Sequence, residues 1–195
     1  KPSLSPVDLE KFWQEMKDRL LPKLIEETSC FMVRNGNFKF YGEPISRFGT
    51  QYGYRCLVAI AGFGANPVDV AVYLKAEEDD KGEKLDAKNR YLLHFNADGL
   101  PPVGKYGFWS ITAYGDDDFL ISNPIERYAI SNRNDFRLND DNSLDLILQT
   151  EEPNENRENW LPVGERGFHL YLRIYRPGNS VLNGTWKAPK ITKID

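Results

Sequence analysis

The stretch Phe168-His169-Leu170-Tyr171-Leu172-Arg173-Ile174-Tyr175 alternates between purely apolar side chains and side chains that carry a polar group. Successive side chains of a β-strand point to opposite faces, so this spacing predicts a strand with one apolar and one polar face. Tyr91, Leu93 and Phe95 repeat the alternation within residues 90–95. Both stretches indicate sheets with one face turned toward a core.

Shorter strand-like runs surround these two stretches, and Gly, Pro, Asn and Asp residues separate them. The runs lie at residues 38–41, 68–75, 108–114, 119–122, 128–131, 144–149 and 191–194. Their number and spacing predict a mainly β fold, a jelly-roll-like β-sandwich. The charge-rich residues 77–84 are predicted to form a solvated loop between two strands.

The amino-terminal segment is predicted to be helical. Ser5-Pro6 is typical of a helix start, and Pro22 is expected to end or kink the helix. An apolar stripe at three- and four-residue steps lies between them: Leu9, Phe12, Trp13, Met16 and Leu20. A second helix is favoured within residues 46–62. The expected organisation is a helical preface and joint over residues 1–66 and a β-sandwich over 67–195, in one globule.

Composition excludes several classes of function. The chain has 195 residues, a net charge of −4 and 13% aromatic residues, with no block of Lys and Arg, which argues against nucleic-acid binding. No apolar run reaches the roughly 20 residues of a membrane span. Cys56 lies in an apolar run and is expected in the core, the alternative being a disulfide with Cys30.

Several motifs resemble two families that occur in tandem, domains of unknown function 1254 and 1214. Residues 46–50, Arg55 and residues 62–67 are similar to the joint between the two families, and residues 85–195 resemble the second family nearly end to end. The resemblance implies an all-β sandwich and carries no activity with it. Such proteins usually have a large amino-terminal domain, so the chain fits a fragment or a shortened member.

Nine side chains are candidates for a site. His94, Tyr114 and Arg173 are the catalytic candidates, and the ligand-binding candidates are Arg90, Trp109, Arg127, Asn159, Trp160 and Tyr175. We expect His94, Arg90, Arg127, Arg173 and Tyr114 to lie close together. Arg and Asn donate hydrogen bonds to carboxylates and hydroxyls, and aromatic rings stack on sugars. The alternative is that these side chains only brace the sandwich, as arginines inside β-proteins commonly do.

Cofactor signatures are weak. No GxGxxG or GxSxG motif occurs, and the two histidines, His94 and His169, lack metal-ligand spacing, so no metal, nucleotide or flavin site is predicted. Asp116–Asp118 and Asn139–Asn142 could bind calcium but lack the EF-hand pattern, and solvated turns are the favoured interpretation.

The sequence therefore favours a carbohydrate-directed module that binds a glycan or cleaves a polysaccharide, for instance by β-elimination on a uronic acid. It is expected to be the carboxy-terminal part of a larger protein. One alternative is a non-catalytic structural or assembly module. The other is part of a small-molecule enzyme that another domain completes. The carbohydrate-directed module would have a glycan as its partner. The alternatives imply a second copy of the chain or another domain of the same protein.

Overall fold

Two units make up the protein, and the computed structural model describes residues 5–194. Unit 1 comprises Lys1–Val33 and Tyr41–Pro67, and unit 2 comprises Arg34–Phe40 and Val68–Asp195. Each unit is described by itself. No helix within residues 5–194 combines the length and apolar character needed to cross a membrane.

Unit 1 is built from helices, as the sequence predicted for this segment. They are α1 (Pro6–Glu15), a π-helical turn (Met16–Leu20), α2 (Leu21–Thr28), a 3₁₀ turn (Ser29–Phe31) and α3 (Tyr52–Ala61). The Ser5 side chain accepts a hydrogen bond from the backbone N–H of Asp8 at 3.2 Å and so caps α1. Pro22 lies in the first turn of α2, directly after the π-helical turn, so the helical path continues past the proline.

The interior of unit 1 centres on Tyr54 of α3, which is 1% exposed. Its ring stacks on Phe31 at 4.3 Å, and its hydroxyl donates to the carbonyl of Gly42 at 2.8 Å. In contrast, α1 contributes no buried residue to this interior. Phe12 and Trp13 of the predicted apolar stripe are 46% and 53% exposed.

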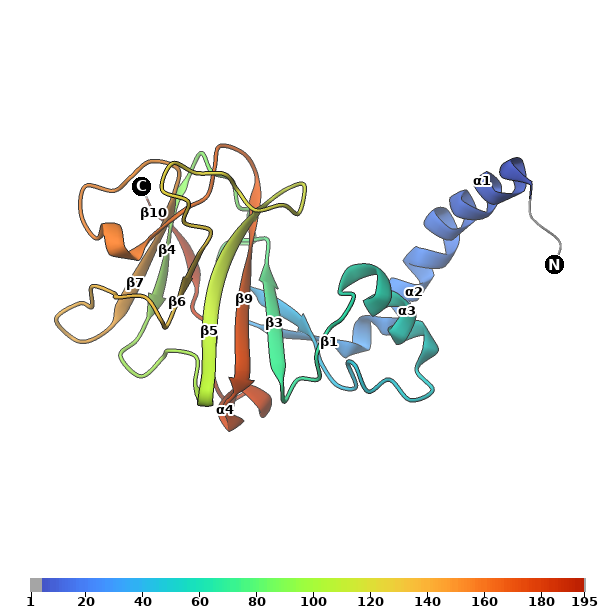
Figure 1. Cartoon of the computed structure of the whole chain (residues 1–195), viewed down its shortest axis with the longest axis horizontal. Helices are drawn as coiled ribbons and strands as arrows, with labels where there is room; N and C mark the ends of the chain where they lie inside the picture. The colour runs from blue at the N-terminus through green and yellow to red at the C-terminus, as the bar shows by residue number, and fades with distance from the viewer. Residues whose placement is uncertain (1–4, 195) are drawn as a thin grey trace. The chain divides into compact units, whose positions relative to one another are not determined.

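Unit 2 is a pair of β-sheets (Figure 1). The larger sheet has six strands in the order β1-β2-β3-β9-β5-β6, and the smaller has four in the order β10-β4-β7-β8. The larger sheet consists of β1 (Met32–Asn35), β2 (Phe38–Tyr41), β3 (Ala71–Ala76), β9 (Phe168–Pro177), β5 (Val103–Gly115) and β6 (Ala129–Ser131). Met32, Val33 and Tyr41, at the ends of β1 and β2, are counted in unit 1. The smaller consists of β10 (Ile191–Ile194), β4 (Arg90–Phe95), β7 (Leu144–Gln149) and β8 (Trp160–Pro162). The predicted mainly β class with an amino-terminal helical segment is confirmed.

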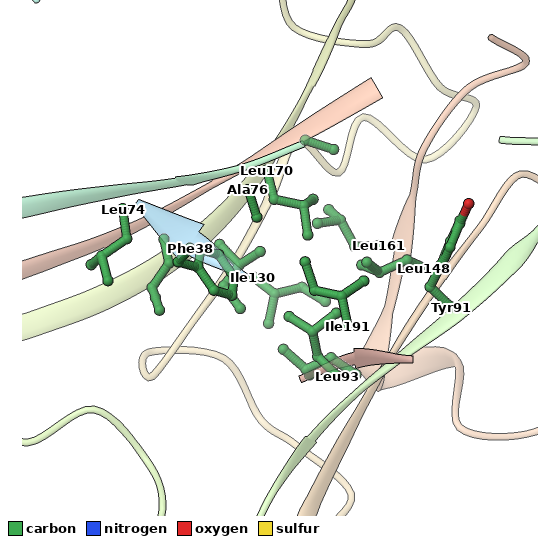
Figure 2. Packing of buried hydrophobic residues seen from close by; sticks show 14 of the residues in the cluster. Phe38, Leu74, Ala76, Tyr91, Leu93, Ile130, Leu148, Leu161, Leu170 and Ile191 are labelled. Atoms are coloured by element: carbon green, nitrogen blue, oxygen red, sulfur yellow. The ribbon is translucent and has the colours of Figure 1, made fainter. Parts of the chain in front are cut away.

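The core of unit 2 is formed by the inner faces of both sheets. Phe168, Leu170, Leu172 and Ile174 of β9 are at most 3% exposed, which confirms the alternation in the sequence. Figure 2 shows Leu170 and Leu74 from the larger sheet in the same apolar cluster as Leu93, Leu148 and Ile191 from the smaller one. Burial of this apolar surface is the dominant favourable contribution to folding.

The segment 34–40 belongs to unit 2 although it precedes the predicted boundary at residue 66. Phe38 is fully buried in the core cluster. The Asn35 side chain donates to the carbonyl of Trp186 at 3.1 Å and accepts from the backbone N–H of Ala188 at 2.9 Å. The predicted boundary between residues 66 and 67 remains a prediction. Replacement of a buried residue in the segment 34–40 can test it.

Two expectations about local structure are wrong. Residues 119–122 do not form a strand, because Leu120 makes only an isolated bridge to Tyr114. Cys56 is exposed on α3, and Cys30 is exposed as well, so both thiols are free. The buried face of α3 is instead formed by Tyr54, Leu57 and Val58. Residues 77–84 form a largely exposed loop, as expected, with Asp79 as its buried member.

Candidate functional site

The most distinctive surface of unit 2 is the outer face of the larger sheet, where β3, β9 and β5 lie side by side (Figure 1). Directly paired residues of antiparallel strands share one face, so the sheet register shows which side chains are neighbours. Arg173 pairs with Tyr73 and Ser110, and Tyr171 pairs with Lys75 and Thr112. We call this surface the tyrosine face; its members are Tyr73, Lys75, Phe108, Tyr114, His169, Tyr171, Arg173 and Tyr175.

Arg173 is held between two tyrosine rings. A guanidinium nitrogen donates to the Tyr114 hydroxyl at 3.0 Å, and the guanidinium carbon lies 5.4 Å from the Tyr114 ring and 5.0 Å from the Tyr171 ring. Guanidinium groups over aromatic faces gain cation–π attraction. Among residues 5–194, no carboxylate forms an ion pair with Arg173. The group is therefore fixed in place while its charge has no anionic partner in this part of the chain.

The rings beside Arg173 form a second aromatic group. Tyr175 stacks on Phe108 with centroids 4.4 Å apart and packs edge-on against Tyr73 at 6.1 Å. All three side chains are half-buried. Burial raises the pKa of the Tyr171 and Tyr175 hydroxyls, so both phenols stay protonated and can donate hydrogen bonds near neutral pH.

One edge of the tyrosine face carries a chain of charged groups. Glu77 bonds to Lys39, and its other oxygen lies 3.0 Å from the Lys75 ammonium, which in turn is 4.0 Å from an Asp118 oxygen. Burial alone would raise the pKa of Glu77, but the hydrogen bonds from Lys39 and Lys75 outweigh it and lower that pKa to about 2. Glu77 is thus ionised at any physiological pH.

His169 lies at the same edge of the tyrosine face. Its ring is parallel to that of Tyr114, with centroids 5.8 Å apart, and it packs edge-on against Tyr171 at 5.7 Å. The Nε2 atom is buried and makes no hydrogen bond, although an Asp118 oxygen lies 3.3 Å away. Burial lowers the pKa of His169, with a further contribution from the Lys75 charge, so the neutral imidazole is favoured near neutral pH.

The predicted gathering of five residues does not occur, which corrects the expectation. Tyr114 and Arg173 meet on the larger sheet, whereas His94 and Arg90 lie on β4 of the smaller sheet. His94 Nδ1 is 2.7 Å from an Asp145 oxygen on the neighbouring β7, and Arg90 Nε donates to Gln149 at 2.9 Å. Two strands with similar sequence alternation belong to different sheets, and the alternation alone carries no information on that.

Four other predicted ligand-binding residues brace the fold. Trp109, Asn159 and Trp160 are at most 3% exposed, which leaves little surface for a ligand. Trp160 Nε1 donates to the carbonyl of Gln149 at 2.9 Å. The Arg127 guanidinium donates to the carbonyls of Arg157 at 2.7 Å and Trp160 at 2.9 Å. These placements support the alternative role that the sequence left open for them.

A cleft of about 440 Å³ lies beside the end of β5, between residues 115–122 and residues 163–167. Asp116, Asp117 and Glu165 line it together with Phe119 and Leu120. Within residues 5–194, no cluster of His, Cys, Asp and Glu could hold a metal ion. The two acidic segments form turns, in which Asp117 and Asp141 accept hydrogen bonds from backbone N–H groups two residues on.

The fold and this surface define a two-sheet β domain with an aromatic and cationic outer face. The model of the family "Protein of unknown function (DUF1214)" matches residues 70–179, which is more than half of the chain, so the chain belongs to the DUF1214 family. This match lies within unit 2. The resemblance of residues 46–50, Arg55 and residues 62–67 to the joint with the other family, domain of unknown function 1254, stays a prediction.

Two further comparisons extend over parts of longer proteins. The crystal structure of the VPA0106 protein from Vibrio parahaemolyticus matches all of this chain and 47% of its own, with a TM-score of 0.68 and 23% identity, which supports the fold. The DNA-directed RNA polymerase III subunit RPC3 of Candida albicans is 29% identical over 110 residues, covering 56% of this chain and 18% of that protein. The chain thus spans less than half the length of either relative.

Five residues of the tyrosine face were not among the candidates chosen from the sequence: Tyr73, Lys75, Phe108, His169 and Tyr171. His169 and Tyr171 share the polar side of β9 with Arg173 and Tyr175, so the alternation that predicted the strand already grouped them. Lys75 comes next to them only through pairing of β3 with β9, which joins residues about a hundred positions apart. No local pattern in the sequence carries that pairing.

Proposed function

We propose that the tyrosine face binds an acidic carbohydrate. The observation that carries the proposal is Arg173, whose guanidinium is held between Tyr114 and Tyr171 and has no carboxylate partner within residues 5–194. A fixed guanidinium is well suited to a carboxylate, because charge-assisted hydrogen bonds are about twice as strong as neutral ones. The half-buried rings of Tyr171 and Tyr175 supply apolar surface for the C–H faces of sugar rings.

Cleavage of such a saccharide is the second candidate, and one observation favours it. The Tyr114 hydroxyl accepts a hydrogen bond from Arg173, so a phenol lies beside the group that would hold the sugar carboxylate. In a β-elimination, a base takes the proton next to the carboxyl carbon, a C=C bond forms, and the bond to the glycosidic oxygen breaks. The leaving oxygen then takes a proton. Arginine stabilises the carboxylate while it gains enolate character.

The experiment is a calorimetric titration with oligogalacturonate and, as the neutral comparison, a cello-oligosaccharide. We expect the acidic oligosaccharide to bind and Arg173→Met to weaken it about tenfold, which corresponds to ~1.4 kcal/mol. Arg90→Met is the matched control, because it removes a guanidinium from the smaller sheet. Ultraviolet absorption of an unsaturated product, present in the wild type and lost in Tyr114→Phe, identifies cleavage.

The proposal fails if the folded protein binds no acidic oligosaccharide, or if both arginine variants lose affinity equally. In that case the arginines and aromatic residues of the larger sheet act as structural braces, as Arg127, Asn159 and Trp160 do.

A further inference from the structure

We propose that Lys75 and His169 form a carboxylate-binding subsite at the edge of the tyrosine face, and that Asp118 occupies this subsite in the unliganded protein. The inference deepens the proposed function by assigning a second position for a carboxylate of the ligand, in addition to the one at Arg173, and it rests on that function only for the class of ligand. Its experiment separates the two claims.

His169 has a buried polar atom without a hydrogen-bond partner. The His169 side chain is 7% exposed, and its buried Nε2 has no hydrogen-bond partner. Leaving a buried polar atom unpaired costs about 1–3 kcal/mol, so such an atom calls for an explanation. An oxygen of the Asp118 carboxylate lies 3.3 Å from this atom without forming a hydrogen bond to it.

Asp118 lies close to both His169 and Lys75. Its carboxylate lies between His169 Nε2 and the Lys75 ammonium, which is 4.0 Å away, and it hydrogen-bonds to neither. Its side chain is 76% exposed, whereas the side chains of Lys75 and His169 are 26% and 7% exposed. An exposed carboxylate in loose contact with two covered donors is easily displaced by a ligand carboxylate with better geometry.

Lys75 and His169 adjoin the aromatic ring of Tyr171. Lys75 lies 5.9 Å from the centre of the Tyr171 ring, and Tyr171 is also the ring that holds Arg173. A sugar that packs on Tyr171 would therefore lie close to two cationic groups. Glu77 neutralises part of the Lys75 charge, and it is shared with Lys39. The subsite is consequently selective for a single carboxylate rather than for a strongly charged anion.

Asp118→Asn is the decisive variant. Asp118 has a φ of 61°, in the left-handed region, which asparagine adopts more readily than most residues, so the turn is retained while the charge is removed. Removal of the competing carboxylate should increase the affinity for galacturonate about fivefold, in line with the coupling of a partly exposed ion pair. Asp140→Asn is the control, since it removes the same charge from a turn that precedes β7 of the smaller sheet.

Imidazole NMR provides the readout, because the chain has only two histidines. Galacturonate and acetate should shift the signals of His169 and leave those of His94 in place, whereas galactose, which lacks the carboxylate, should shift neither. His169→Gln assigns the signals. Lys75→Met should weaken galacturonate binding about fivefold, as loss of one cationic partner implies.

The inference is overturned if neither carboxylate shifts the His169 signals, or if Asp118→Asn fails to increase galacturonate affinity. If acidic oligosaccharides bind but Asp118→Asn has no effect, the subsite is wrong and the proposed function stands. If acetate shifts His169 and no saccharide binds, the subsite stands and the carbohydrate proposal is wrong.

Discussion

Replacement of Asn159 by alanine distinguishes a brace from a ligand-binding residue. Asn159 is 1% exposed and makes three hydrogen bonds that connect separate loops. Its oxygen accepts from the backbone N–H of Arg137 at 3.0 Å, and its nitrogen donates to the carbonyls of Arg137 at 2.7 Å and Asp145 at 2.9 Å. A ligand-binding asparagine would lose affinity on substitution, whereas a brace loses stability.

The size of the effect follows from these three bonds. Each hydrogen bond contributes about 1 kcal/mol, and unpaired buried partners add to the loss, so we expect Asn159→Ala to lower the free energy of unfolding by about 2–3 kcal/mol. For a protein of this size that corresponds to a Tm lower by roughly 4–12 °C. The denaturant dependence of the unfolding free energy should stay unchanged, because the surface exposed on unfolding is the same.

Urea unfolding of the wild type, Asn159→Ala and Asn154→Ala is the assay. Asn154 is exposed in the same connection between β7 and β8, so its replacement should change stability by less than about 0.5 kcal/mol. A loss below about 1 kcal/mol for Asn159→Ala, or an equal loss in the two variants, would refute the bracing role.

Three further predictions concern charge, core and thiols. The pKa of Glu77 is lowered from 4.5 to about 2, so its contribution is complete above pH 4.5 and is lost as the pH falls toward 2. The pKa shift alone would correspond to about 3 kcal/mol of stability. Because the Glu77 side chain is 40% exposed, we expect Glu77→Gln to lower the free energy of unfolding by only about 1 kcal/mol at neutral pH, and by less in acid. Equal losses at both pH values would contradict this. Phe38→Ala should cost about 3–5 kcal/mol, and more than Phe40→Ala, because Phe38 is fully buried and Phe40 only partly. A cost for Phe38→Ala below about 0.5 kcal/mol in urea melts, as for a surface residue, would show that Phe38 is not part of the unit 2 core. Cys30 and Cys56 are both exposed and free, so a thiol reagent should label two thiols in the native protein, and labelling that requires denaturant would count against their placement.

The sequence predicted those strands whose own side chains define two faces. The run 144–149 coincides with β7, because Leu144, Leu146 and Leu148 alternate with the other side chains. The run 191–194 coincides with β10, although only its first and last residues are apolar. The strands β1 and β8 were missed, because neither Met32–Asn35 nor Trp160–Pro162 alternates between apolar and polar side chains. The run at 119–122 has strand-like composition but lies in a turn region with Phe119 and Leu120 exposed, so composition alone misled there.

The site was less accessible from the sequence than the fold. Arg173, Tyr114 and Tyr175 were selected correctly as residues of one face, because β9 places Arg173 and Tyr175 on its polar side. Both histidines alternate with apolar residues, and His94 was preferred over His169 because of its place in a motif that resembles the family; nothing local shows that β4 and β9 belong to different sheets. Trp109 and Trp160 were chosen as aromatic ligands for sugars, yet tryptophan fills the interior equally well, and burial decides between these roles.

A ligand that binds the tyrosine face should depend on residues of the larger sheet and not on those of the smaller sheet. Oligogalacturonate is titrated calorimetrically into the wild type, Tyr171→Ala and His94→Ala, with thermal melts to verify that all three are folded. Tyr171 lies between Lys75 and Arg173 on the tyrosine face, and His94 lies on β4 of the smaller sheet. Our account predicts that Tyr171→Ala weakens binding about tenfold or more while His94→Ala binds like the wild type. Loss of binding in His94→Ala with wild-type affinity in Tyr171→Ala would contradict it.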